Sequence, residues 1–147
     1  MPGILVGVDG SDDSRRALAW AMREAVQRHV PLTVMTVRPD PAQPVTQIYW
    51  NVPGLSERSY DLGLERAAVR RFADEVARES GETVPELIAD VTTGDPAEEL
   101  VKASRNADML VVGSRGSGVF AELLMGSVSS KVAHHAACPI VIVPGPR

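Results

Sequence analysis

The sequence has a single cysteine, Cys138, so it cannot form a disulfide within the chain. Such sparse cysteine use is typical of a reducing compartment, and we expect a cytoplasmic protein. No apolar run approaches the roughly 18 residues that a membrane-spanning helix needs. No basic region precedes the first apolar run, which argues against a secretory signal. The sequence therefore predicts no membrane partner.

Positive charge is also scarce, because the net charge is −4 and the arginines are scattered among acidic residues. Nucleic-acid binding usually requires a clustered basic surface, so we expect no nucleic-acid partner. The length of 147 residues suits one domain with one substantial core. We therefore treat residues 1–147 as a single domain.

Short apolar runs alternate with stretches in which apolar residues recur at helical spacing. The runs predict strands at Ile4–Val8, Leu32–Val37, Glu86–Val91, Met109–Val112 and Pro139–Val143. The stretches between them predict helices from Ser11 to near His29, and over Glu57–Ser80, Ala97–Asn106 and Ser127–Ala137. Strict alternation of this kind implies an α/β fold with a parallel sheet and helices on both faces. Ligands of such sheets bind beyond the carboxyl ends of the strands.

A glycine-rich stretch lies at the end of the fourth predicted strand. Gly113 and Gly116 form one turn, and Gly126-Ser127 forms a second turn at the start of a helix. Glycine lets a ligand approach the backbone closely, and a helix start offers unpaired N–H groups that favour phosphate. No Gly-Lys-Ser/Thr follows these glycines, so this is not a Walker-type loop.

Four segments carry a resemblance that extends over essentially the whole chain: VGVDGS, Gly94-Asp95-Pro96, DMLVVGSRG and GSVSSKVAHHAACPIVIVP. With the total length, they resemble the universal stress protein family, in its ATP-binding subgroup. The resemblance implies an open, doubly wound, five-stranded parallel sheet with strand order 3-2-1-4-5. This fold is Rossmann-like and of the adenine nucleotide alpha hydrolase-like type.

The resemblance also implies roles for individual residues around an adenine nucleotide. Asp9 matches the acidic residue that contacts the ribose or a bound metal, although it could instead only cap the turn at Gly10-Ser11. Val37 matches the position whose backbone recognises adenine, and Gly7 and Val8 line the same side. The phosphate-facing positions, and those that continue or add to them, are Gly113, Arg115, Gly116, Gly126, Ser127, Val128 and Ser129.

The implied cofactor is ATP, with Mg²⁺ reaching the site through Asp9. No nucleophile–base pair can be named, so we expect no dedicated catalysis and at most slow ATP hydrolysis. The favoured function is that of a nucleotide-responsive stress protein. Two alternatives stay open: a dimeric interaction protein with a vestigial pocket, and an ATP-hydrolysing enzyme of the same fold family.

Three further features bear on metals and partners. His134, His135 and Cys138 are close in sequence, but adjacent helical residues diverge by about 100°, so we expect no metal site there. The apolar run Ile140–Val143 is predicted to be an edge strand that pairs with a second copy in a homodimer. The proline-rich segment Arg38–Ser59 is open to two interpretations, a lid or dimer arm and a tolerated surface insertion.

Overall fold

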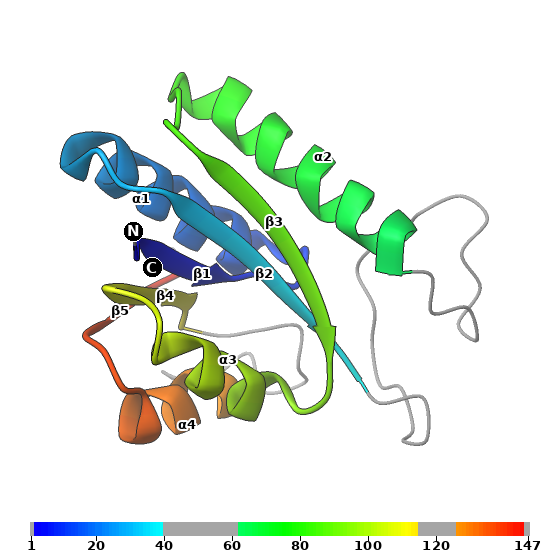
Figure 1. Cartoon of the computed structure of the whole chain (residues 1–147), viewed down its shortest axis with the longest axis vertical. Helices are drawn as coiled ribbons and strands as arrows, with labels where there is room; N and C mark the ends of the chain where they lie inside the picture. Colours follow the sequence, from blue (N-terminus) through cyan, green and yellow to red (C-terminus); the bar gives the residue numbers. More distant parts are fainter. Residues whose placement is uncertain (1, 40–61, 115–125, 146–147) are drawn as a thin grey trace.

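The computed structural model describes residues 2–39, 62–114 and 126–145. Within these residues, strands and helices alternate along the chain (Figure 1). Their order is β1 (Ile4–Gly7), α1 (Asp12–Arg28), β2 (Leu32–Arg38), α2 (Leu62–Ser80), β3 (Leu87–Thr93), α3 (Pro96–Ser104), β4 (Met109–Gly113), α4 (Ser127–His135) and β5 (Ile140–Val143). Most of the segment Arg38–Ser59, and the start predicted for the second helix, lie outside the described residues.

The five strands form one parallel sheet in the order β3-β2-β1-β4-β5. The predicted fold class and strand order are thereby confirmed. Strand β1 is central, and its Val6 lies in register with Val34 of β2 and Val111 of β4. All three valines are completely buried, which explains why these strands read as continuous apolar runs. The less apolar β3 and the terminal β5 are the two edges, as the sequence indicated.

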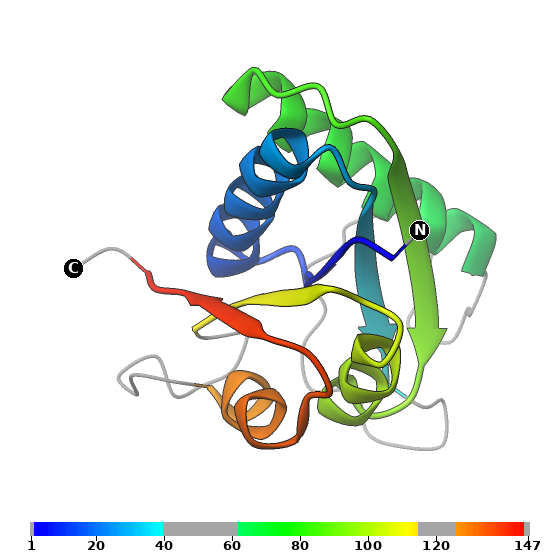
Figure 2. The same ribbon diagram turned by 60° about the vertical axis from the view of Figure 1, so that its left-hand side comes forward.

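Helices cover both faces of the sheet, with α1 and α2 on one side and α3 and α4 on the other (Figure 2). The α1 face of the core includes Leu18 and Met22, neither of which is accessible to solvent. Burying a side chain of this size contributes about 1.5–3 kcal/mol. On the opposite face, Leu100 of α3 and Val132 of α4 pack against alternate residues of β1 and β4. Among the described residues, no helix is both long and apolar enough to cross a bilayer.

The helix ends follow from local chemistry. The Ser11 side chain accepts a hydrogen bond from the Ser14 N–H at 3.2 Å, and His29 ends α1 in the left-handed conformation. Asp95 caps α3 by accepting from the Glu98 N–H at 3.0 Å. Both starts agree with the sequence.

Several elements end one or two residues from the predicted positions, and two of these differences have a clear physical reason. Strand β3 continues to Thr93 because its pairing with β2 extends that far. Helix α4 stops at His135, two residues early, because the backbone at Ala136 is extended. The next N–H, that of Ala137, donates to the Ser104 hydroxyl oxygen at 2.9 Å. This contact comes from a distant part of the chain, which helical periodicity cannot reveal.

Candidate functional site

The predicted site lies at the carboxyl edge of the sheet, where β1, β2 and β4 end side by side. Because β1 is central, the residues at its end lie between those that end the other two strands (Figure 1). The strand order thus brings the regions of Asp9, Val37 and Gly113 to one edge, as the sequence indicated. Strand order reverses on either side of β1, which is where open α/β sheets bind ligands.

The end of β1 is held by both its main chain and a side chain from β2. The Val8 N–H donates to the Met35 carbonyl at 2.9 Å, and the Val8 carbonyl accepts from the Thr36 hydroxyl at the same distance. Asp9 follows directly, and its Oδ1 accepts from the Ser11 N–H at 2.9 Å. This is the turn-capping role that the sequence left open for Asp9, and it fixes the carboxylate at the sheet edge.

Two of the glycines lie close against helices. A Cβ added to Gly7 would lie 2.9 Å from Leu100 Cδ1 of α3. A Cβ added to Gly113 would lie 3.0 Å from the carbonyl oxygen of Asp13 in the first turn of α1. The missing side chain of Gly113 leaves room for the main chain of α1, and close approach of phosphate at Gly113 stays a prediction.

The carbonyl of Ser114 joins the end of β4 to the start of α4. It accepts from the Gly126 N–H at 2.5 Å and from the Ser129 hydroxyl at 2.8 Å. Ser114 and Ser129 are both buried, and the Ser129 hydroxyl also lies 3.1 Å from the Gly126 carbonyl. The Ser129 hydroxyl therefore makes its hydrogen bonds to main-chain carbonyls inside the protein. The sequence analysis missed Ser114, because a main-chain acceptor leaves no signal in residue type.

The start of α4 differs from the starts of α1 and α3. Those two helices have capping side chains and acidic residues in their first turns. The N-cap residue of α4 is Gly126, which provides no side-chain cap, and the first turn of α4 has no acidic residue. No side chain of that first turn therefore offsets the positive dipole end, and negative charge is favoured there. Ser127 is exposed at this helix start, and Val128 is half-buried beside it.

The end of β2 carries an ion pair that the sequence analysis did not identify. Arg38 follows Val37, and its Nε lies 2.5 Å from Oε1 of Glu65 in the first turn of α2. Their side chains are only 6% and 4% exposed. The Arg38 carbonyl accepts from the Gly94 N–H at 2.8 Å. The pair fixes the main chain next to Val37. Its two members are too far apart in the sequence for a local pattern to reveal the pair.

Arg115 and Gly116 lie outside the described residues. The rings of His134 and His135 have centroids 6.4 Å apart at the other end of α4. Among the residues that the structure describes, no group of three or more His, Cys, Asp or Glu side chains is arranged to hold a metal ion.

The sheet order and the helices on both faces define a Rossmann-like α/β protein. The family model described as the universal stress protein family matches residues 2–144. The chain belongs to the universal stress protein family.

Comparisons with individual proteins agree with this assignment. A universal stress protein of Mycolicibacterium smegmatis is 34% identical over 156 residues, covering 97% of this chain and 48% of the relative. The chain spans about half the length of the curated relatives it matches. A universal stress protein solved in complex with cAMP has a TM-score of 0.69 at 27% identity, covering 97% and 96% of the two chains. One from Archaeoglobus fulgidus in complex with dAMP has a TM-score of 0.63 at 24% identity, covering 97% of each.

Proposed function

We propose that this chain binds an adenine nucleotide at the carboxyl edge of its sheet and acts as a nucleotide-responsive regulatory protein. The observation that carries this proposal is the start of α4, which has neither a capping side chain nor an acidic residue in its first turn. Phosphate suits such a helix start, because free N–H groups and the helix dipole both favour negative charge. Solved relatives in complex with cAMP and dAMP support the same ligand class.

Within this proposal ATP is the expected nucleotide, with the Ser127 hydroxyl and the main-chain N–H groups of Ser127 and Val128 facing the phosphates, because the Gly126 N–H already donates to Ser114. Val37 presents main-chain groups to the adenine, Gly7 and Val8 line the same side, and Asp9 faces the ribose or a Mg²⁺ ion. Mg²⁺ would compensate phosphate charge. We infer at most slow hydrolysis, because no base is placed beside a nucleophile among the described residues at this edge.

A charge placed at the start of α4 tests the phosphate site. Ser127→Asp adds an acid where the helix dipole stabilises it, by about 0.3–1 kcal/mol. The fold should therefore survive while ATP affinity, measured by calorimetry, falls at least ~10-fold through repulsion of phosphate. Ala133→Asp is the matched control, because it adds the same charge on an exposed part of α4 further along. Equal ATP affinity in Ser127→Asp and the wild type would refute the site.

Assays on the purified protein distinguish the two alternative functions. If denatured protein releases no adenine nucleotide and added ATP produces no thermal shift, the pocket is vestigial and interaction carries the function. Steady phosphate release that is lost in Asp9→Ala, with ATP binding retained, would instead indicate an ATP-hydrolysing enzyme.

We also propose that the chain forms a homodimer through β5. Ile140–Val143 is an apolar edge strand in which all four residues remain partly accessible to solvent. An apolar edge of this kind is usually paired or covered, and pairing with the same strand of a second copy gives a two-fold interface. Light scattering should give twice the chain mass at micromolar concentration. A mass of one chain across the concentration range would contradict the dimer.

A further inference from the structure

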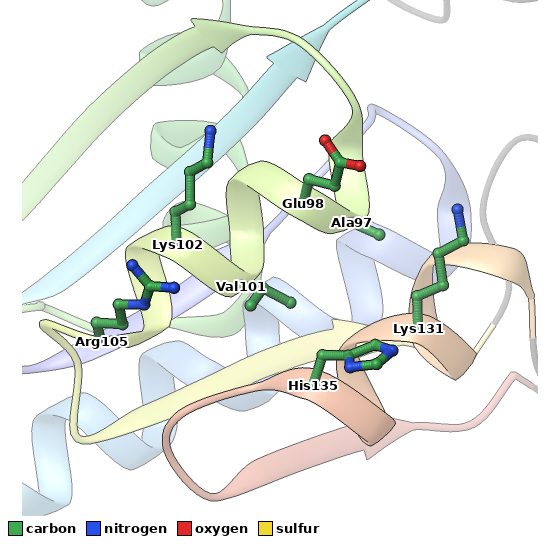
Figure 3. Close-up of a pocket in the computed structure, with 7 residues that line it drawn as sticks. All are labelled: Ala97, Glu98, Val101, Lys102, Arg105, Lys131 and His135. Atoms are coloured by element: carbon green, nitrogen blue, oxygen red, sulfur yellow. The ribbon is translucent and has the colours of Figure 1, made fainter.

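A groove of about 330 Å³ lies between α3 and α4, on the outer side of the layer that they form (Figure 3). Its floor is apolar, made by Ala97 and Val101 of α3. Figure 3 shows His135 of α4 beside Val101, so the imidazole forms part of the opposite wall. The residues that line this groove are distinct from those of the proposed nucleotide site.

The groove is basic although the chain as a whole has a net charge of −4. Lys102 and Arg105 line it from α3, and Lys131 lines it from α4. The chain has only two lysines, and both lie here. Glu98 is the one acidic residue among the lining side chains, and α4 contains no acidic residue at all. A local positive field of this kind favours an acidic partner.

The basic residues lie along the two walls of the groove and do not converge on one point. Lys131 and His135 are four residues apart on α4, which is a rise of about 6 Å. Lys102 and Arg105 are three residues apart on α3, and Figure 3 shows the amino groups of Lys102 and Lys131 well separated on the two helices. One phosphate or carboxylate could not contact this whole set. An extended peptide presents side chains on one face every ~6.6 Å, so it can bring separate carboxylates to separate points along the two walls.

We propose that the α3–α4 groove binds an extended acidic peptide segment of a partner protein. Carboxylates on alternate residues of the segment pair with Lys102 and Arg105 on one wall and with Lys131 on the other. A small apolar side chain of the segment rests on Ala97 and Val101. Lys102 can exchange its partner Glu99 for a carboxylate of the segment. Its side chain is 67% exposed, and its contact with Glu99, at 3.2 Å, is a surface pair.

The test uses a fluorescein-labelled peptide of about eight residues in which glutamate alternates with alanine and valine, together with a matched peptide containing glutamine in place of glutamate. Fluorescence anisotropy should show binding of the glutamate peptide alone, weakening as NaCl rises from 50 to 300 mM because exposed charges are screened. Amide chemical shifts should change on α3 and α4. The experiment needs no nucleotide, so its outcome is independent of the proposed function.

Two double variants test whether the glutamate peptide binds in the α3–α4 groove. Lys102→Gln with Lys131→Gln should weaken binding of the glutamate peptide roughly 3- to 20-fold, the range expected for loss of two exposed ion pairs. Arg71→Gln with Arg78→Gln is the matched control, because it removes the same charge from exposed positions on α2, across the sheet. That control should bind as the wild type does.

Three outcomes would overturn the proposal. The first is failure of the glutamate peptide to bind, or equal binding of the glutamine peptide. The second is equal loss in the α2 control, which would indicate a general charge effect. The third is a change of oligomeric mass in the double lysine variant, which would assign the groove to a second copy of this chain.

Discussion

The buried ion pair between Arg38 and Glu65 should contribute more to stability than any surface ion pair of this protein. Its two side chains are at most 6% exposed, and the pair joins the end of β2 to the first turn of α2. Glu65→Gln keeps the shape of the side chain but removes the negative charge that faces the Arg38 guanidinium. Removing one member of a buried pair typically costs about 3–5 kcal/mol. That is a large fraction of the roughly 5–15 kcal/mol by which native proteins are stable.

Urea denaturation measures this loss in the free energy of unfolding, and a thermal melt measures the fall in Tm, both followed by circular dichroism. In a domain of this length each kcal/mol shifts Tm by about 2–4 °C, so Glu65→Gln should lower Tm by ~6–20 °C. Replacing both members, in Arg38→Met with Glu65→Leu, should cost much less than the sum of the single changes, since both charges of the pair are then removed together. The exposed pair of Arg15 with Glu79, at 3.0 Å, supplies the control. Glu79→Gln should change the free energy of unfolding by less than ~1 kcal/mol.

Two results would refute this reasoning. One is a loss below ~1 kcal/mol in Glu65→Gln, which would mean that the carboxylate contributes no more than a surface group. The other is strict additivity of the single changes, which would mean that the two side chains do not act as a pair.

Three further predictions follow from single contacts. Asp95→Ala should destabilise the protein by about 1 kcal/mol through loss of the α3 cap. Asp95→Asn should retain most of that stability in the same urea assay, because asparagine also caps helices. Equal losses in the two variants would exclude a capping role. Gly113→Ala should cost about 1–3 kcal/mol, because its Cβ would meet the main chain of Asp13, and an unchanged melting curve would contradict that packing. Burial, and next the charge of Asp108, raise the pKa of the Cys138 thiol, so alkylation by iodoacetamide should be slow near neutral pH and accelerate as the pH rises. Asp108→Asn should lower that pKa and speed the reaction at a given pH, whereas an unchanged rate would exclude the Asp108 effect.

The fold was predictable because its signals are local. The run Ile4–Val8 is apolar on both sides of the strand, so it indicated a buried central strand. The Asp95-Pro96 pair indicated a helix start from the chemistry of two adjacent residues. Strand order came from the family resemblance, because the periodicity of one strand does not identify its neighbours.

The site was predictable in position and less so in mechanism. Sequence patterns brought Asp9 and the start of α4 to one edge of the sheet, since parallel strands end together. They did not reveal that the Ser129 hydroxyl is directed at main-chain carbonyls. They also did not reveal that Gly113 makes room for α1. Both features depend on contacts between segments far apart in the sequence, which residue type alone does not encode.

The Ser114 carbonyl has a consequence for how members of this fold can diverge. It receives the Gly126 N–H and the Ser129 hydroxyl, so the chain leaves β4 and enters α4 at one fixed point. For a connection between two fixed points, each doubling of its length costs only about 0.6 kcal/mol of closure entropy. We therefore expect insertions between β4 and α4 to leave the relative positions of these two elements unchanged.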